Sequence, residues 1–389
     1  MPVAQPGSVS DVTGETLPDT FEIGPIRPPS EAGSYLLRLT RGCPWNRCRF
    51  CRSYKRHRFS LRSVDEIRGD IDAMARARDR LRGLHPGGPR GAVRAGLVGT
   101  SEEWQVANAL AAGGRTAFLQ DADSLVMRPP QVREVLAHFR LRFPEVDRIT
   151  TYARSHTLAR LSADDLSSYR ELGLTRIHVG LESGCDALLR LIQKGASAEI
   201  HVRAGRAVVE AGLELSEYVM PGLGGRELSE AHARETATVL GAIDPHFIRL
   251  RTLCLGPKLA LWEEFQTGRL TRQTDVEILG EVRAFVEALE GIRSRLTSDH
   301  VLNLLGDLEG TFPADKPRLL AQCDAFLSLP AREQRLFQVG RRAGLLEGLR
   351  DLQDPGRRAS CETLLGELTE VCGPDGIEEG VRSMLQRFV

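Results

Sequence analysis

The sequence predicts an α/β fold built on a parallel sheet, wound either as a barrel or as an open sheet. Strand and helix patterns alternate from Ser34 onward over roughly 220 of the 389 residues. Six strand-like segments lie in this stretch, fewer than the eight strands of a complete (β/α)8 barrel. After residue 270 the pattern is mostly helical and carries no strong strand signal.

Apolar runs and capping residues locate the elements. The six predicted strands span residues 35–40, 115–120, 148–152, 176–181, 213–219 and 247–253. The predicted helices span residues 63–82, 129–143, 162–172, 186–193, 197–211 and 229–242, and residues 92–114 are partly helical. Ser63 and Glu66 have the S-x-x-E spacing of a capping box, Pro129 stands at a helix start, and Ser162 is a candidate N-cap.

Three segments are expected along the chain: a flexible leader over residues 1–30, a barrel-like region over 31–300 and a helical extension over 301–389. The leader is polar and rich in Pro, Gly and acidic residues, without the order of a signal peptide. No stretch approaches the roughly 18 continuous apolar residues of a membrane span. We therefore expect a cytoplasmic protein, without a membrane partner, whose thiols stay reduced.

Composition narrows the classes of partner. The 52 Lys and Arg residues balance 52 Asp and Glu, so the formal net charge is zero. This balance argues against a general polyanion binder, although a local basic groove is compatible with it. Aromatic residues make up 5% of the chain, which does not favour a stacking platform for single-stranded nucleic acid. A small-molecule substrate is favoured over a nucleic acid.

Three of the eight cysteines crowd into nine residues. Cys43, Cys48 and Cys51 form a C-x4-C-x2-C triad directly after the first predicted strand, where α/β barrels place their chemistry. A structural zinc site needs a fourth ligand, which His57 or His85 could provide. Three cysteines alone suit a [4Fe–4S] cluster that leaves one iron open. The spacing favours iron–sulfur and keeps zinc as an alternative.

The surroundings of the triad resemble the radical S-adenosylmethionine (SAM) superfamily, over about residues 34–255. Phe50 stands just before the last cysteine. Residues 180–186 (GLESGCD), with Lys194-Gly195 downstream, resemble the fourth-strand region of methylthiotransferases, oxygen-independent coproporphyrinogen oxidases and Elongator-like members. The usual triad spacing is C-x3-C-x2-C, and the longer first gap here bears on the subfamily more than on the superfamily.

The resemblance implies a fold, cofactors and an activity. The fold would be a partial (β/α)6 TIM-like barrel with a helical C-terminal extension. Cys43, Cys48 and Cys51 would hold a [4Fe–4S] cluster whose fourth iron is chelated by SAM. An electron donor such as flavodoxin or ferredoxin would reduce the cluster, SAM would be cleaved to a 5′-deoxyadenosyl radical, and that radical would abstract hydrogen from an unidentified substrate. The chain would then be an enzyme.

Acids and an arginine after the second and third strands are candidate SAM contacts within this resemblance. Asp121 and Asp123 would accept hydrogen bonds from the SAM ammonium, in place of the family's Gly-Gly-Glu-type segment. Arg154 would bind the SAM carboxylate with paired hydrogen bonds. Loop or capping acids and an ordinary surface arginine explain these three residues equally well.

Later strands supply three further candidates. Glu182 would bind the ribose or the ammonium, and its place after an apolar strand is costly for an unpaired carboxylate. Lys194 would reach the SAM carboxylate, although a cation capping a helix end explains it as well. Gly222 lies in a glycine-rich run that would let the backbone approach SAM closely, or that forms only a turn.

Two features leave the function open. His300, with Asp299 before it and Asn303 after it, could line the substrate side of the barrel, although a helix N-cap explains Ser298 or Asp299 equally well. The alternatives to a small-molecule radical SAM enzyme are a non-catalytic protein with structural zinc or iron–sulfur, and a tRNA- or protein-modifying radical SAM enzyme.

Overall fold

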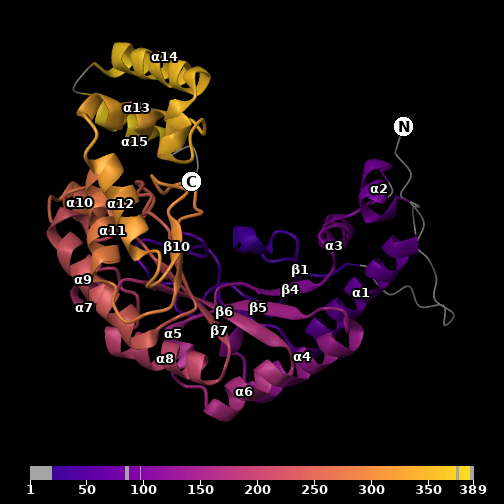
Figure 1. Ribbon diagram of the computed structural model, residues 1–389. Coiled ribbons are helices and arrows are strands. Elements are labelled where there is room, and N and C mark those ends of the chain that lie inside the picture. Colours follow the sequence, from indigo (N-terminus) through magenta and orange to yellow (C-terminus); the bar gives the residue numbers. More distant parts are fainter. Residues whose placement is uncertain (1–19, 84–86, 97, 374–375, 386–389) are drawn as a thin grey trace, which may run out of the picture. The chain divides into compact units, whose positions relative to one another are not determined.

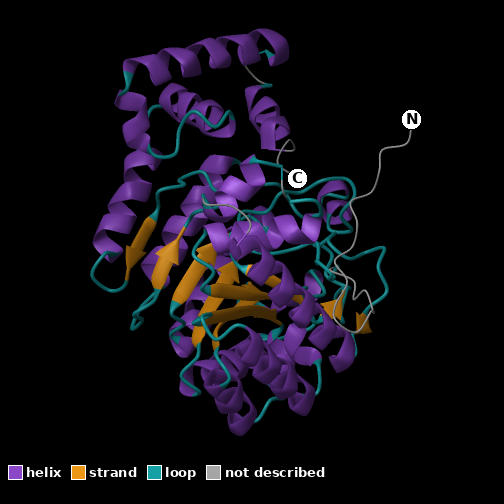
Figure 2. Ribbon diagram, turned by 90° about the vertical axis from the view of Figure 1, so that its right-hand side faces the viewer, coloured by secondary structure: helices purple, strands orange, loops and turns teal. Residues whose placement is uncertain are grey.

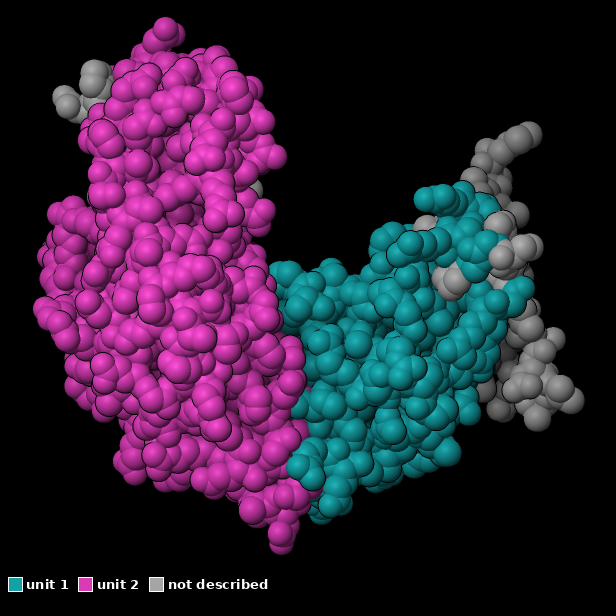
Figure 3. All heavy atoms as spheres, viewed as in Figure 1, with its two compact units in different colours: residues 1–43, 58–152, 168–175 teal, residues 44–57, 153–167, 176–389 magenta. Residues whose placement is uncertain are grey.

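The computed structural model describes residues 20–83, 87–96, 98–373 and 376–385. The chain divides into two compact units (Figure 3). Unit 1 comprises Met1–Cys43, Arg58–Tyr152 and Ser168–Thr175, and unit 2 comprises Pro44–His57, Ala153–Ser167 and Arg176–Val389. These bounds differ from the predicted segments 1–30, 31–300 and 301–389, which remain predictions.

Unit 1 contains a parallel sheet in the order β1-β4-β5. Its apolar residues are buried, as is usual in parallel sheets, and Leu37, Phe118 and Ile149 are inaccessible or nearly so. Leu37 pairs in register with Leu119, and Phe118 pairs with Thr150. The strands span Tyr35–Arg38 (β1), Thr116–Gln120 (β4) and Arg148–Ala153 (β5).

The helices of unit 1 begin where the caps predict them. Ser63 and Glu66 make both hydrogen bonds of the capping box, with the Ser63 backbone N–H donating to Glu66 at 2.8 Å and Glu66 N–H donating to Ser63 Oγ at 3.2 Å. Residues 92–114, predicted to be partly helical, contain the end of one helix and the whole of a second. The helices of this unit are α1 (Val64–Gly83), α2 (Gly88–Arg94), α3 (Ser101–Ala111), η2 (Ser124–Val126) and α4 (Pro129–Arg142).

Residues 20–30, part of the expected leader, make specific contacts in unit 1. Phe21 is buried, and Gly24 exchanges hydrogen bonds with the Gln120 side chain at 2.8 and 3.0 Å. The helical turn η1 (Pro29–Glu31) follows. The Gln120 amide satisfies the backbone of Gly24. Residues 1–19 lie outside the described residues.

Unit 2 contains a second set of strands, in the order β6-β7-β8-β9-β10. The first four are parallel neighbours, and β10 runs antiparallel to β9. The strands β9 and β10 lie after residue 270, where the sequence carries no strong strand signal. Each has three residues, too few for an alternating pattern, and pairing with a neighbour stabilises them. The bounds are Leu174–Glu182 (β6), Glu214–Val219 (β7), Phe247–Leu250 (β8), Arg295–Thr297 (β9) and Glu309–Thr311 (β10).

Helices cover the strands of unit 2, as Figures 1 and 2 show. Ser162 caps α6 as predicted, accepting the Asp165 N–H at 3.1 Å. Both α6 (Ala163–Glu171) and β6 cross the boundary between the units along the chain. The remaining helices are α5 (Ser155–Leu158), α7 (Asp186–Leu191), α8 (Ala198–Glu210), α9 (Gly225–Ile243), α10 (Trp262–Gln266), α11 (Asp275–Ala288) and α12 (Lys316–Leu327).

The C-terminal residues of unit 2 are helical, as predicted, and they gather in the yellow part of Figure 1. Phe337 on α13 is fully buried, and Val381 on α15 is 2% exposed, so these helices have an apolar core. They are α13 (Ala331–Arg342), η3 (Leu349–Gln353), α14 (Pro355–Cys372) and α15 (Ile377–Leu385). None of the helices within the described ranges is long and apolar enough to cross a membrane.

Candidate functional site

A short antiparallel ribbon in unit 1 brackets the cysteine triad. Strands β2 (Thr40–Arg41) and β3 (Ser60–Leu61) pair Thr40 with Leu61 and Arg41 with Ser60. Gly42 follows β2 with a φ of +88°, a conformation that favours glycine. The chain therefore leaves the ribbon, passes through Cys43, Cys48 and Cys51, and returns to it. All three cysteines are free thiols of intermediate exposure.

The part of this loop in unit 2, residues 44–57 (the cluster loop), is docked by its backbone. Arg49 N–H donates to the Ile192 carbonyl at 2.9 Å, and Leu261 N–H donates to the Arg49 carbonyl at 3.0 Å. Trp45 Nε1 donates to the Gln193 carbonyl at 2.7 Å. A Cβ at Gly195 would lie 2.5 Å from the Trp45 ring, so the ring approaches the backbone there as only glycine permits.

Arg49 ties the same loop to α10. Its guanidinium forms an ion pair with the buried Glu264 and donates to the Ala260 carbonyl at 3.0 Å. Hydrogen bonds from Arg269 lower the pKa of Glu264 to about 2, with a further contribution from Arg49, against the opposing effect of burial. Glu264 is therefore ionised at neutral pH and holds Arg49 in place.

The donor chemistry of the triad fits an iron–sulfur cluster. Cys48 and Cys51 share a tight turn in which Cys51 N–H donates to the Cys48 carbonyl at 3.3 Å. Burial raises the pKa of the Cys48 thiol, and the charges of Cys51 and Glu182 add to that rise, whereas the positive charges of Lys194 and Arg154 oppose it. These cations would stabilise a thiolate ligand. Three soft sulfur donors without a disulfide suit iron–sulfur ligation.

The two histidines named as a possible fourth zinc ligand can be placed only in part. His57 is exposed, and its ring meets Tyr54 edge-on with the centroids 6.4 Å apart. His85 lies outside the described residues. No three His, Cys, Asp or Glu side chains in the described ranges, the three cysteines included, are grouped closely enough to hold a metal ion. The fit to a cluster therefore rests on the types of donor and on the neighbouring cations, not on the distances between the thiols.

An ion pair beside the cluster loop contains two predicted SAM contacts. Lys194 Nζ lies 3.0 Å from Glu182 Oε1, and the two side chains are 12% and 11% exposed. Glu182 has a φ of +65° at a register shift in β6, and its carbonyl accepts the Met220 N–H at 3.0 Å. A non-glycine residue in this conformation is strained, which is common at functional sites. Lys194 Nζ also lies 5.8 Å from the Phe50 ring centre.

The neighbours of Lys194 stabilise its charged form. Burial alone would lower the pKa of its ammonium, but the Glu182 carboxylate and the Cys48 sulfur outweigh that effect, so the pKa is raised. Arg154 adds a second cation: its Nη2 donates to the Lys194 carbonyl at 3.0 Å, and its guanidinium lies 5.2 Å from the Trp45 ring centre. Unit 2 thus brings together Cys48, Arg154, Glu182 and Lys194.

Gly222 lies in the same unit, after β7, with a φ of +82°. Its N–H donates to Glu281 Oε1 at 2.8 Å, and Glu281 Oε2 accepts from Ser229 Oγ at 2.6 Å and Gln273 Nε2 at 3.1 Å. The glycine-rich turn is therefore fixed by a buried carboxylate from α11. The sequence identified the turn but not Glu281, because the contact joins residues 59 positions apart.

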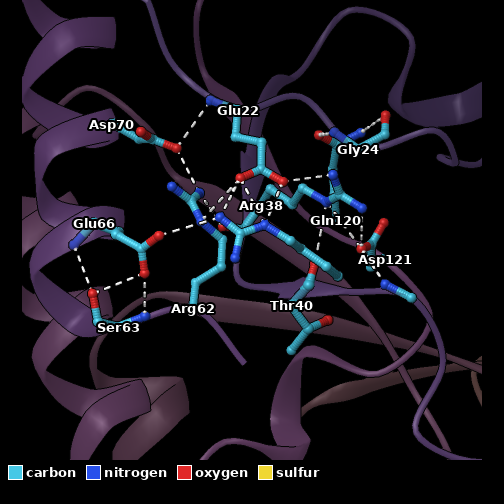
Figure 4. A network of polar contacts seen from close by, with 12 residues as sticks. Glu22, Gly24, Arg38, Thr40, Arg62, Ser63, Glu66, Asp70, Gln120 and Asp121 are labelled. Atoms are coloured by element: carbon cyan, nitrogen blue, oxygen red, sulfur yellow. Dashed lines mark hydrogen bonds and ion pairs between the residues drawn. The ribbon is translucent and has the colours of Figure 1, made fainter. Parts of the chain in front are cut away.

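Asp121 belongs to unit 1, where an arginine already forms an ion pair with its carboxylate. Its Oδ2 accepts from Arg38 Nε at 3.0 Å, from Arg38 Nη2 at 2.9 Å and from the Gly42 N–H at 3.0 Å (Figure 4). The side chain is fully buried. A carboxylate bound this way fixes the residue before Cys43, and this contact argues against its predicted role as an acceptor for the SAM ammonium. Asp123 is also fully buried in this unit, where its carbonyl accepts the Val126 N–H.

Arg38 is a residue that the sequence reasoning missed. Besides Asp121 it binds Glu22 at 2.6 Å, and Glu22 in turn binds Arg41 at 2.6 Å and Arg62 at 3.4 Å (Figure 4). A single arginine inside the apolar run of β1 was the signal available, since such a charge is costly unless it has a partner. Its partners Glu22 and Asp121 could not be found, because they come from two other segments of the chain.

The polar group around His300 is not a helix N-cap. No helix begins between residues 298 and 308, which lie within the described part of the chain. Instead Asp299 accepts from Arg249 at 2.8 Å and Arg251 at 2.9 Å, and Asn303 Oδ1 accepts from Thr252 at 2.9 Å. These contacts join the chain after β9 to the end of β8.

Comparisons with known proteins place this geometry in a family. The model of the radical SAM superfamily matches residues 37–237, just over half of the 389-residue chain. Among curated proteins, 67 residues are 30% identical to a tRNA uridine(34) acetyltransferase of Methanocaldococcus infernus, over 17% of this chain and 12% of that protein.

Similar solved structures include Elp3 of the archaeon Methanocaldococcus infernus and HemN of Escherichia coli, the latter described as a radical SAM enzyme. Elp3 is 16% identical with a TM-score of 0.39, over 51% of this chain and 52% of Elp3. HemN is 16% identical with a TM-score of 0.38, over 44% of this chain and 40% of HemN. The chain thus spans about half, or less, of the length of these relatives.

Sequence and structure agree on the class of protein. The superfamily uses a [4Fe–4S] cluster and SAM, and its members are enzymes. The three closely spaced cysteines lie within the matched residues, as do the ion pair of Glu182 with Lys194 and the strands from β2 to β7. The chain belongs to the radical SAM superfamily.

Proposed function

We propose that the chain holds a [4Fe–4S] cluster through Cys43, Cys48 and Cys51 and binds SAM beside it. When bound, the two groups supply reductive cleavage of the sulfonium C–S bond, which yields methionine and a 5′-deoxyadenosyl radical that abstracts a hydrogen atom from the substrate. The protein's own residues bind SAM, orient it and keep water away from it.

Each charged residue near Cys48 has a role in this proposal. Lys194 and Arg154 bind the SAM carboxylate, because both are cations at the cluster loop. Glu182 accepts from the SAM ammonium or from the ribose hydroxyls. The turn at Gly222 lets the backbone approach the adenine or methionine part. Asp123 is kept as a candidate for the ammonium, and Asp121 is proposed to position Gly42 instead.

One observation supports the proposal most strongly. A nearly buried lysine–glutamate pair touches the cluster loop through Phe50 and influences the Cys48 thiol. A buried ion pair adds little to folding stability, because desolvation of both charges offsets their attraction. Its place beside the proposed cluster is therefore better explained by ligand binding than by stability.

The test is anaerobic reconstitution followed by a cleavage assay. The wild-type protein should be brown and hold about four irons and four sulfides per chain. Reduced protein with SAM should form 5′-deoxyadenosine. Cys48→Ala should lose both the cluster and cleavage, whereas Cys372→Ala, which alters an exposed cysteine on α14, should keep both. Colourless zinc-bound protein, or cleavage by Cys48→Ala, would refute the proposed ligands.

The substrate and electron donor are also proposals. We propose a small-molecule substrate and a reductant such as flavodoxin or ferredoxin, in the cytoplasm. Transfer of deuterium from a labelled candidate into 5′-deoxyadenosine would identify the substrate. The short match to a tRNA uridine(34) acetyltransferase makes tRNA a second candidate in that assay. Deuterium transfer from a tRNA, and none from small molecules, would overturn the small-molecule proposal.

A further inference from the structure

Unit 2 contains a hollow that the proposed SAM contacts do not use, apart from Gly222 at its edge. Counted out to its open mouth, this hollow encloses about 660 Å³ of space. It lies among the chain after β8, the start of α11 and the C-terminal helix α15. Its apolar lining consists of Leu253, Leu255, Phe265, Ile278, Val381 and Leu385.

Arg272 lines this hollow without a hydrogen-bonding partner among the described residues. Its guanidinium stacks on the Trp262 ring at 4.0 Å, and no carboxylate or carbonyl of the described chain accepts from it. Burial lowers the pKa of Arg272 and the nearby charge of Arg382 lowers it further, whereas the charge of Glu379 opposes this shift without a hydrogen bond to Arg272. Arginine has five N–H donors, and half-buried arginines normally bind an acceptor. Arg272 therefore has N–H donors available to bind an anion.

Gln273 provides a hydrogen-bond acceptor, whereas Arg272 provides donors. Its side chain is 9% exposed, and its Oε1 atom has no partner among the described residues. Nε2 donates to Ser229 Oγ at 2.9 Å and to Glu281 Oε2 at 3.1 Å. The carboxylate of Glu281 fixes the orientation of the amide, because Oε1 facing a carboxylate would be repelled. Oε1 therefore lies on the side of Gly222, whose Cβ position is 4.0 Å away.

A neighbouring hollow leads toward the cluster loop. It is lined by Phe50 and Arg52, on either side of Cys51, and it shares Cys254 and Leu255 with the first hollow. Counted out to its open mouth, it encloses about 790 Å³, which is more than the first hollow encloses. The smaller first hollow suits the recognised end of a small molecule, and the larger one suits the part that faces the cluster loop.

From these contacts we propose that the two hollows bind a small organic oxyanion, a carboxylate or a phosphate ester, whose charge pairs with Arg272. The ligand has an apolar body that packs on Leu253 and Val381, and one N–H or O–H that donates to Gln273 Oε1. That this ligand is the substrate rests on the proposed radical SAM function. The binding itself does not, so it can be measured in protein without a cluster.

The test uses two oxyanions with their uncharged analogues on the full chain without a cluster. Titration calorimetry and Trp262 emission are recorded with 4-methylpentanoate against 4-methylpentanamide, and with phenyl phosphate against phenol. At least one oxyanion should bind saturably and about ten-fold more tightly than its uncharged analogue, as expected for a charge-assisted hydrogen bond. The oxyanion that binds identifies the ligand as a carboxylate or a phosphate ester.

Variants separate binding from folding. Arg272→Gln should remove the preference for the oxyanion and keep or raise the melting temperature, because the replaced cation has no partner in the described structure. Arg269→Gln, which alters an exposed arginine bound to Glu264, should keep the preference. Equal binding of charged and uncharged probes, no saturable binding of either oxyanion, or wild-type binding by Arg272→Gln would each overturn the proposal. Loss of SAM cleavage with intact oxyanion binding would refute only the proposed function.

Discussion

Two groups of buried charges in this protein differ in how completely their hydrogen bonds are satisfied. In unit 1, Asp121 is surrounded by the Arg38 guanidinium and the Gly42 N–H, and Arg38 also binds Glu22. In unit 2, Lys194 binds only one carboxylate oxygen among the described residues, and Arg272 binds none. The first arrangement holds the backbone before Cys43. The second leaves donors available, which is what a ligand site requires.

Removing the Asp121 carboxylate should have the largest effect on the free energy of unfolding. Asp121→Ala leaves Arg38 partly unpaired and Gly42 N–H without its acceptor, so unfolding free energy should fall by about 3 to 5 kcal/mol. Chemical denaturation of the protein without a cluster measures this loss. Asp147→Ala, which removes an exposed partner of Arg115, should cost less than about 1 kcal/mol. Equal losses in the two variants would show that the Asp121 group does not stabilise the fold.

The second prediction concerns Glu217, a buried acid in unit 2, which the variant Glu217→Gln tests. Glu217 is 1% exposed, and its Oε2 has no partner among the described residues. Burial raises the pKa of this carboxyl well above its usual range. The folded state therefore keeps a proton that the unfolded state releases above about pH 4.5, and stability from this group falls as the pH rises, by about 1.4 kcal/mol per pH unit up to the folded pKa.

Glu217→Gln removes that dependence, so the variant should gain stability over wild type as the pH rises from about 4.5. Denaturation curves at a series of pH values measure the difference. Glu214→Gln is the matched control, since Glu214 is on the same strand and binds Arg176 near the surface. A constant difference between Glu217→Gln and wild type across this range would contradict a neutral Glu217.

A paired replacement separates binding from stability at the proposed SAM site. Glu182→Gln with Lys194→Gln exchanges an ion pair for two neutral amides, which should leave the melting temperature close to that of wild type. SAM affinity should nevertheless fall by about ten-fold, because a charge-assisted contact to the carboxylate is lost. Equilibrium dialysis with SAM gives this affinity. Unchanged SAM affinity in the folded double variant would show that the pair does not bind SAM.

The smallest effect is expected at the anchor of the cluster loop. The pKa of Glu264 is about 2, so its ion pairs contribute stability above pH 4.5 and lose it as the pH falls from about 4.5 to about 2. Glu264→Gln should therefore cost about 1 to 2 kcal/mol at neutral pH, reduced because Arg269 is largely exposed. The curves of variant and wild type should meet near pH 2. Parallel curves down to that pH would contradict the assignment.

Patterns of residues close together in the chain gave the predictions of helix starts and strands that the structure confirms. The capping residues Ser63 and Ser162 mark helix starts that the structure confirms, and all six predicted strands are present. The fold class and the family followed from strand–helix alternation and from cysteine spacing. These features depend on residues close together in the chain, which is why they can be read without coordinates.

Contacts between distant segments were not predictable in the same way. Arg38 and Asp121 are 83 positions apart, and Gly222 and Glu281 are 59 positions apart. The strands β9 and β10 are too short to show a period and form through pairing. Arg272 and Gln273 look like ordinary residues of a polar turn, and only their missing partners within the described structure distinguish them.

The docking of the cluster loop has a consequence for the order in which the protein matures. The chain around the cysteines is closed by the β2–β3 ribbon in unit 1 and held through Arg49 and Trp45 in unit 2. Part of the conformational entropy of ordering residues 44–57 is therefore lost when the polypeptide folds, before iron and sulfide bind. Cluster binding then has less of this loop left to order, and bringing the three thiols together is the step that remains.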